Sequence, residues 1–280
     1  MERKIYVIVG PTASGKSGLA LNLAKKIKGS IVNADSMQIY KDLKILSARP
    51  DEAEMDGIPH FLYGYLDAYQ ANSVSDWLKR AVEKLKEVER PILVGGTGMY
   101  VSALINGLSP IPNVDPVIRE TVRNMSIDDV KKQVKECSAI DPQRLRRALE
   151  IQLSTGKTLS YFQNLPKIKL LDANFDIFFV NPERDILYHN CNQRLVQMVN
   201  NGAIEEVRHL LNINATGGVV KAIGVPEIVE YLSGKNSFEK MVQQIQLSTR
   251  HYAKRQVTWF KNQLTGMCEI KNPVDFVFTV

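Results

Sequence analysis

The octapeptide GPTASGKS, residues 10–17, constrains the fold of this chain more than any other segment. It matches the pattern G-x-x-x-x-G-K-[ST]. The run IYVIV at residues 5–9 predicts a buried strand directly before it, and Lys16 to Lys28 has the apolar spacing of a helix. A strand, a glycine-rich loop and a helix in this order predict a phosphate-binding loop (P-loop) at the carboxyl edge of a parallel sheet.

The same strand, loop and helix pattern recurs further along the chain. Residues 30–34 suit a short strand, and residues 74–89 suit an amphipathic helix that Pro91 ends. Residues 92–94 predict another strand, followed by Gly95-Gly96-Thr97-Gly98 and an apolar helix over residues 100–105. We therefore expect an α/β fold: a P-loop core with a parallel sheet and helices on both faces.

The pattern changes at SPIPN, residues 109–113, after which about sixty residues have the spacing of amphipathic helices rich in Arg and Lys. FDIFFV at residues 175–180 predicts a strand that returns to the sheet, and long helices are expected near residues 184–200 and 238–262. We predict residues 1–112 as the first part of the P-loop core, 113–172 as a small helical insertion domain, and 173–280 as the second part of the core with the C-terminal helices.

Charge and composition narrow the class of protein. The net charge is +6, and residues 116–170 carry 11 Lys and Arg against 6 Asp and Glu, a bias that suits a phosphate backbone. No apolar run approaches the roughly 18 residues of a membrane span, so we expect a cytoplasmic protein. The cysteines Cys137, Cys191 and Cys268 lie far apart, which argues against a disulfide framework and a zinc site.

The P-loop residues have definite chemical roles. The glycines let the backbone approach phosphate oxygens, and the helix start adds partial positive charge. Lys16 supplies a mobile cation and Ser17 can hold Mg²⁺. The loop does not specify whether the phosphates belong to a nucleoside triphosphate or to another pyrophosphate ester.

Two further candidates follow predicted strands and should emerge at the same edge as the P-loop. Asp35 follows the second strand, where a carboxylate could accept a proton or assist magnesium, and it could instead cap the next turn. Thr97 follows the strand at residues 92–94, and its hydroxyl could contact a substrate or begin a helix. Both residues are therefore candidates for a substrate site.

Taken together, several segments resemble one family. They are GPTASGKS, ADSMQIY at residues 34–40, LVGGTGMY at 93–100, DPQRLRRALE at 141–150, STGKT at 154–158 and TRHYAKRQVTWF at 249–260. In this order they resemble the bacterial tRNA dimethylallyltransferases. The family resemblance implies transfer of a dimethylallyl group from dimethylallyl diphosphate to N6 of adenosine 37 of tRNA, with release of diphosphate and participation of Mg²⁺.

The resemblance also implies roles for individual residues. Asp35 would accept the amine proton, with Lys16 and Thr12 completing the catalytic group. The diphosphate ligands would be Gly10, Pro11, Thr12, Ala13, Ser14, Gly15, Lys16, Ser17 and Lys221, with the metal at Ser17. The tRNA contacts would be Asp35, Ser36, Met37, Gln38, Thr97, Arg119, Gln143, Arg144, Leu145, Arg146 and Arg147. We expect a monomer that binds the tRNA anticodon loop and dimethylallyl diphosphate and that does not bind a membrane.

The sequence departs from the family pattern at Lys221, where an arginine is expected, at Val225, where a tyrosine is expected, and at residues 137–142. A lysine keeps the charge but not the planar bidentate geometry of arginine. Two alternatives stay open from the residues alone. One is a P-loop kinase acting on a nucleotide or small metabolite, and the other is a non-catalytic RNA-binding protein that uses nucleotide as a switch.

Overall fold

The computed structural model describes residues 3–135 and 140–278, and it divides the chain into two units. The first unit contains the residues up to Ile105 and those from Leu171 onward, and the second is Asn106–Leu170. The predicted boundaries of the insertion, 113–172, lie a few residues later than these. Of the three cysteines, Cys137 lies outside the described residues, while Cys191 is buried and Cys268 is exposed.

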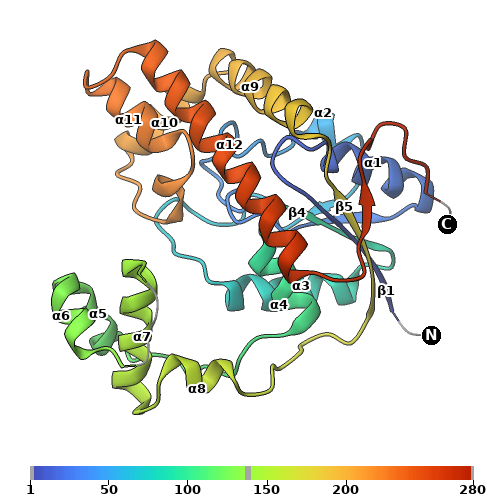
Figure 1. Ribbon diagram of the computed structural model, residues 1–280. Helices are drawn as coiled ribbons and strands as arrows, with labels where there is room; N and C mark the ends of the chain where they lie inside the picture. Colours follow the sequence, from blue (N-terminus) through green and yellow to red (C-terminus); the bar gives the residue numbers. More distant parts are fainter. Residues whose placement is uncertain (1–2, 136–139, 279–280) are drawn as a thin grey trace. The chain divides into compact units, whose positions relative to one another are not determined.

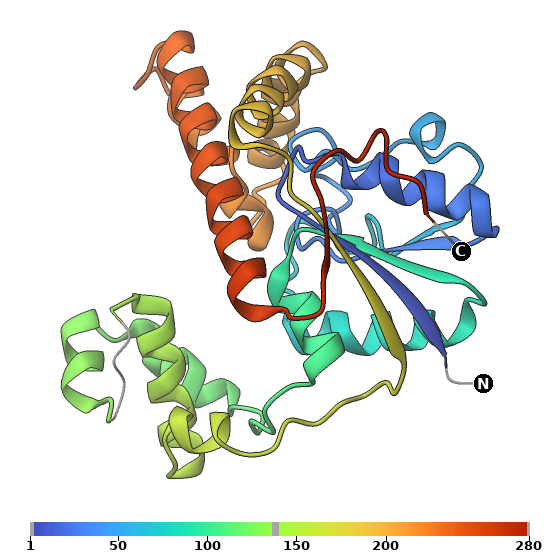
Figure 2. The same ribbon diagram turned by 45° about the vertical axis from the view of Figure 1, so that its right-hand side comes forward.

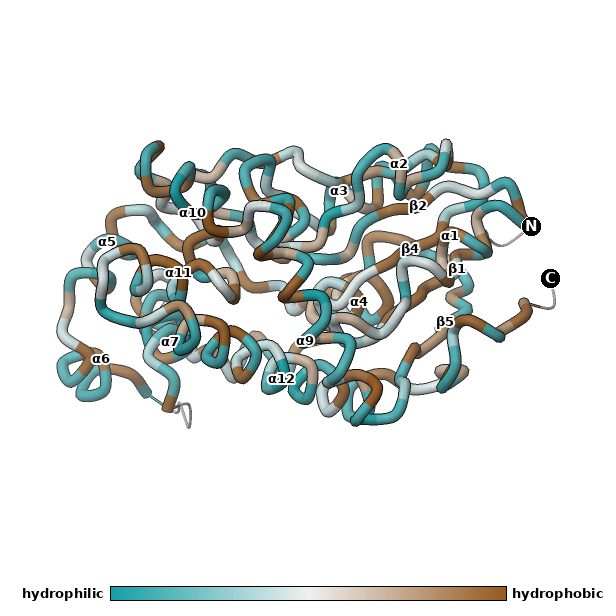
Figure 3. The backbone as a smooth tube through the Cα atoms, turned by 90° about the horizontal axis from the view of Figure 1, so that it is seen from above, coloured by the Kyte–Doolittle hydropathy of each residue, from teal (hydrophilic) through white to brown (hydrophobic). Residues whose placement is uncertain are grey.

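The first unit is built on a six-stranded sheet with the order β3-β2-β4-β1-β5-β6. Each pair of neighbouring strands in this sheet is parallel, and β1 pairs with both β4 and β5 near its centre (Figure 1). The strands are β1 Lys4–Val9, β2 Ser30–Asn33, β3 His60–Phe61, β4 Pro91–Gly95, β5 Asn174–Val180 and β6 Cys268–Ile270. The hydrophobic residues of β1 and β4 explain their central position, since both faces of such strands are covered (Figure 3).

Helices cover both faces of this sheet, as Figure 2 shows. Helix α1, Lys16–Ile27, packs on one face through Leu19 and Leu23. Helices α3, Val74–Glu87, and α4, Gly98–Asn106, lie on the other face, where Trp77 and Tyr100 stack with their ring centroids 4.2 Å apart. The short α2, Glu52–Met55, follows β2. The α/β prediction with helices on both faces is therefore confirmed.

The rest of the first unit is helical. It contains α9 Arg184–Asn200, α10 Ala203–Asn212, the 3₁₀ turn η1 Gly218–Lys221, α11 Val225–Leu232 and α12 Phe238–Gln263. These helices and the loop at residues 39–46 share an apolar cluster that includes Leu43, Leu195 and Ile245. Helix α12 also reaches the sheet, where Phe260 contacts Phe179 of β5.

The second unit is a small helical body with a core of its own. It contains α5 Pro116–Asn124, α6 Ile127–Gln133, α7 Pro142–Thr155 and α8 Leu159–Gln163. Val122, Val130, Leu145 and Leu149 form one buried cluster. The amphipathic spacing of the sequence thus serves to bury one side of each helix within this unit.

In the described part of the chain, every helix is too short or too polar to span a bilayer.

Candidate active site

The P-loop, residues 10–17, connects β1 to α1. Ala13 and Gly15 have positive φ angles of 62° and 88°, a conformation that is unfavourable for alanine and that clusters at functional sites. Gly15 precedes α1, and no side chain of the described residues caps the first amides of this helix. The Ser14 hydroxyl is buried and has no hydrogen-bond partner among those residues. These unsatisfied groups suit the oxygen atoms of a bound phosphate.

The lysine of this loop, Lys16, has a lowered pKa. The Lys16 ammonium donates to the carbonyl oxygen of Pro11 at 3.2 Å. Burial lowers the pKa of Lys16 to about 8; Asp35 opposes this effect, and Arg194 adds to it. A cation held in a partly buried position beside another cation is stabilised when an anion binds.

Asp35 follows β2 and is fixed by its neighbours. Its carboxylate accepts a hydrogen bond from the Met37 amide at 2.8 Å, and its own amide donates to Oδ1 of Asn33 at 2.9 Å. Asn33 is fully buried, its Nδ2 donates to the carbonyl oxygens of Asp35 and Leu62, and its own carbonyl accepts from the indole of Trp77 at 3.0 Å. The backbone of Asp35 is thus anchored to the sheet.

Thr97 connects the loop after β4 to the loop after β2. Its hydroxyl accepts the Ser36 amide at 2.9 Å and donates to the Ser36 hydroxyl at 3.2 Å. Its amide donates to the carbonyl of Ala34 at 3.2 Å. Because β2, β4 and β1 are neighbours in the sheet, the loops carrying Asp35, Thr97 and Lys16 meet at one edge, as the sequence predicts for a substrate site.

A cavity of about 360 Å³ opens at this edge. Its polar and charged lining includes the side chains of Thr12, Asp35, Arg194, Lys221, Tyr252 and Arg255. Its apolar lining consists of Met37, Leu46, Leu195, Met198, Ile223 and Ile245, together with Ala222. A second cavity of about 400 Å³ is lined by residues 13–18, from the P-loop and the start of α1, and again by Arg194. Together the two cavities present positively charged and apolar side chains, and Arg194 lines both of them.

Arg194 on α9 was not predicted from the sequence. Its guanidinium donates to the hydroxyl of Thr12, and burial lowers its pKa, while Cys191 and Asp35 oppose the shift. Asn190 and Cys191 of the same helix contact the carbonyl oxygens of Ala13 and Thr12. Helix α9 therefore supports the P-loop from outside the motif, and no short sequence pattern marks that role.

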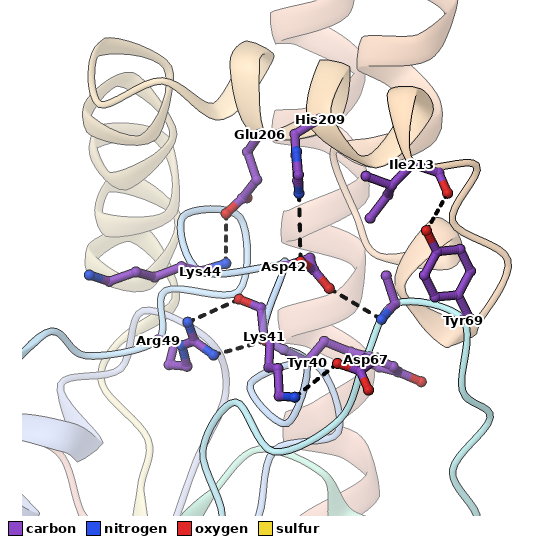
Figure 4. A network of polar contacts seen from close by, with 11 residues as sticks. Tyr40, Lys41, Asp42, Lys44, Arg49, Asp67, Tyr69, Glu206, His209 and Ile213 are labelled. Atoms are coloured by element: carbon purple, nitrogen blue, oxygen red, sulfur yellow. Dashed lines mark hydrogen bonds and ion pairs between the residues drawn. The ribbon is translucent and has the colours of Figure 1, made fainter.

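One wall of the first cavity, the one lined by Leu46, is held by a polar network (Figure 4). The Glu206 carboxylate of α10 accepts the amides of Lys44, Ile45 and Leu46 at 2.6, 2.7 and 2.9 Å. One turn further, His209 lies 3.6 Å from the carboxylate of Asp42. Three amides shared by one carboxylate fix the turn that places Leu46 in the cavity wall.

The other predicted contacts differ in what their side chains do. Gln38 donates its amide to the carbonyls of Ser47 and Ala48, so it stabilises the cavity wall. Met37 and Lys221 line the cavity, and Ser17 is exposed at the start of α1. Within the described residues no cluster of three or more metal-ligating side chains occurs, so Ser17 could hold magnesium chiefly together with phosphate oxygens.

In the second unit, the predicted tRNA contacts divide into exposed and structural residues. Arg119, Gln143 and Arg144 are exposed, and Arg147 forms a 3.1 Å ion pair with Glu150 while its side chain stays 40% exposed. Leu145 is 3% exposed in the core.

Arg146 donates to the carbonyl oxygens of Val122, Arg123 and Met125 at the end of α5. Leu145 and Arg146 therefore hold this unit together, which leaves the exposed residues of the set available to a partner.

A P-loop, a fixed carboxylate and cavities with charged and apolar linings lie together at the carboxyl edge of a parallel sheet, an arrangement typical of enzymes that bind phosphate groups. The family model described as IPP transferase matches residues 38–263. The chain belongs to this family of tRNA-modifying prenyltransferases.

Individual relatives agree with this assignment. The chain is 41% identical to the tRNA dimethylallyltransferase of Rickettsia felis, over 94% of this chain and 91% of the relative, and 41% identical to that of Sphingopyxis alaskensis, over 92% and 89%. Among solved structures, it is similar to the tRNA isopentenylpyrophosphate transferase of Bacillus halodurans, with a TM-score of 0.72, 33% identity, and 96% and 90% of the two chains covered. A eukaryotic dimethylallyltransferase acting on tRNA matches with a TM-score of 0.81 and 25% identity, over 98% and 75%.

Proposed function

We propose that this enzyme transfers the dimethylallyl group of dimethylallyl diphosphate to N6 of adenosine 37 in tRNA and releases diphosphate. The observation that carries the proposal is that Thr12 and Asp35 line a cavity with charged and apolar residues, while Lys16 lines a second cavity and Arg194 lines both. A diphosphate ester with a branched five-carbon tail matches this arrangement, because its charge suits Lys16 and Arg194 and its tail suits Met37 and Leu46.

The chemistry follows from these positions. The bond between C1 of the allyl group and the diphosphate oxygen breaks, and C1 bonds to N6 of the adenine. Lys16, Arg194 and the P-loop amides stabilise the charge that develops on the departing diphosphate. Asp35, held by Asn33 and the Met37 amide, accepts the proton that N6 loses. Thr12 would contact the diphosphate from the position in which Arg194 holds its hydroxyl.

Magnesium is part of this proposal. The exposed Ser17 hydroxyl at the start of α1 would hold the ion together with diphosphate oxygens, which suits the octahedral oxygen coordination of Mg²⁺. When bound, the ion would neutralise part of the diphosphate charge. The ligands Gly10 to Ser17 and Lys221 are proposed for the diphosphate, where Lys221 provides charge without a bidentate contact.

The tRNA would lie on two surfaces, each proposed from its own unit. Asp35, Ser36 and Thr97 would meet the target adenosine, which must leave its stack to reach a carboxylate that lines a cavity. Of the residues predicted in the second unit, Arg119, Gln143 and Arg144 are exposed and Arg147 is partly exposed, and we propose that these four contact the RNA backbone. We further propose a monomeric enzyme of the cytoplasm, where its RNA substrate is made.

The test is direct. The protein is incubated with Mg²⁺, dimethylallyl diphosphate labelled in the allyl group, and unmodified tRNA, and label is sought in the RNA. Label that nuclease digestion releases as a modified adenosine supports the proposal. Transfer of the γ-phosphate of ATP to a nucleotide, with no label in RNA, would instead identify the kinase alternative.

A further inference from the structure

Gln256 of α12 joins two loops of the site through one buried side chain. Its Oε1 accepts the amide of Thr12 in the P-loop at 2.8 Å, and its Nε2 donates to the carbonyl oxygen of Gly96 after β4 at 2.9 Å. The side chain is 6% exposed. Because one partner is a donor and the other an acceptor, a single amide orientation satisfies both contacts.

The glycines of the second loop allow this approach. A Cβ atom at Gly96 would lie 2.4 Å from Nε2 of Gln256, and one at Gly98 would lie 2.1 Å from the ring of Trp259 on the same helix. Two of the three glycines in GGTG therefore leave room for one face of α12. The glycine pattern is explained by the seating of this helix as well as by the turn itself.

The two loops that Gln256 joins serve different substrates in the proposed reaction. The P-loop amide belongs to Thr12, whose hydroxyl contacts Arg194 in the diphosphate part of the cavity. Gly96 is followed by Thr97, which bonds to Ser36 beside the proposed base of the reaction, Asp35. Gln256 thus connects the loop proposed to bind dimethylallyl diphosphate, the prenyl donor, with the loop proposed to contact the target adenosine, the prenyl acceptor.

We propose that Gln256 is a positioning residue. It sets the distance between the P-loop, which holds the prenyl donor, and the loop at residues 95–98, which lies on the side of the acceptor adenosine. This inference rests on the proposed function, since it assigns the two loops to the two substrates of that reaction. In-line transfer needs C1 and N6 in contact, and a small displacement of one loop against the other lowers the rate even when both substrates are bound.

Two variants separate positioning from simple stability. Gln256→Met keeps the length of the side chain and removes both hydrogen bonds. Gln256→Glu as a neutral acid can still accept from Thr12 and donate to Gly96, but as a carboxylate it faces the Gly96 carbonyl with like charge. Gln243→Glu is the matched control, because Gln243 is exposed on the same helix.

The expected results concern the rate at saturation. Gln256→Met should lower the single-turnover rate by about 100-fold with saturating tRNA and donor, while both KM values stay within about threefold of the parent. The rate of Gln256→Glu relative to the parent should rise as the pH falls from about 8 to about 6, since burial favours its neutral form. The parent and the variant share the other titratable or charged groups of the site, namely Lys16, Asp35, Arg194 and Tyr252. The ratio of the two rates therefore reports the titration of the residue at position 256.

A parent-like rate at saturation in Gln256→Met, or a pH-independent parent-like rate in Gln256→Glu, would overturn the proposal. If the methionine variant fails to fold, the pH ratio of the glutamate variant decides. Amide hydrogen exchange at Thr12, measured on the full chain, should be faster in Gln256→Met than in the parent and unchanged in Gln243→Glu. If the parent enzyme shows no prenyl transfer but the variants show these exchange rates, the proposed function is refuted. The connection that Gln256 makes between the two loops would still stand.

Discussion

The guanidinium group of Arg194 contacts the hydroxyl of Thr12, although 182 residues separate them in the chain. Arg194 also lines both cavities, so it connects the cavity beside the P-loop with the cavity that Asp35 and Leu46 line. Its partly buried position beside Lys16 concentrates positive charge at this point. Through this contact, α9 adds a positive charge to the proposed phosphate site from outside the P-loop motif.

Replacing this arginine should therefore weaken donor binding. We expect Arg194→Gln to raise the KM for dimethylallyl diphosphate by about 10- to 100-fold, the equivalent of one or two charge-assisted hydrogen bonds. Steady-state kinetics with saturating tRNA measure this effect. Arg184→Gln, an exposed position on the same helix, should leave the KM unchanged. Equal KM values for parent and Arg194→Gln would show that this side chain only supports Thr12.

The lowered pKa of Lys16 predicts a pH dependence. Below a pH of about 8 the side chain of the free enzyme is an ammonium ion, and above it the cation is lost. The kcat/KM for dimethylallyl diphosphate should therefore fall as the pH rises beyond about 8. Lys16→Met should be slower by about 100-fold or more and should lack this alkaline decline.

The control for this pH profile is Lys28→Met, which changes an exposed lysine just after α1. It should retain the parent profile. An alkaline decline of the same shape in Lys16→Met would assign the titration to another group.

Asp35→Asn should impair chemistry more than binding. Asparagine keeps the shape and can still accept the Met37 amide, but it offers no carboxylate to take the proton from N6. We expect the single-turnover rate at saturating donor and tRNA to fall by about 100-fold or more, with substrate affinities nearly unchanged. Asp67→Asn, at an exposed ion pair with Lys41, is the control. A parent rate in Asp35→Asn would leave Asp35 a structural role.

The exposed arginines of the second unit predict a salt-dependent contribution to tRNA affinity. Replacing Arg119, Arg144 and Arg147 together with glutamine should reduce the slope of log affinity against log salt by about 2 to 3, because each phosphate contact contributes about 0.7 to 0.9. Filter binding over a range of salt concentrations measures this slope. The control replaces Lys28, Lys79 and Lys86, which are exposed lysines of the first unit. An unchanged slope in the arginine variant would place the RNA elsewhere.

Much of the fold could be predicted because its central elements have long, regular patterns. The strand at residues 5–9, the loop GPTASGKS and the helix from Lys16 correspond to β1, the P-loop and α1. The short strands β3 and β6, with two and three residues, were not predicted, since such lengths show no periodicity. They extend the sheet at its two edges, and His60 of β3 also lines the cavity beside the P-loop.

The site was predicted only where a local motif marks it. Asp35 and Thr97 follow apolar strands, so their place at the sheet edge could be inferred from the parallel topology. Arg194 and Gln256 lie within helices, and their roles depend on tertiary contacts with Thr12 and Gly96. In sequence, Gln256 is one more polar residue in a basic helix. A periodic pattern shows which helix face is buried, but not which loop that face meets.

The hydrogen bond between Thr12 and Gln256 spans 244 residues, which has a consequence for how this protein matures during synthesis. The P-loop leaves the ribosome first, and domains tend to fold from the N-terminus as the chain grows. The amide of Thr12 cannot meet its partner until α12 has also emerged. A nascent chain can thus carry the complete phosphate-binding motif long before it carries a working site, because the site also needs Gln256.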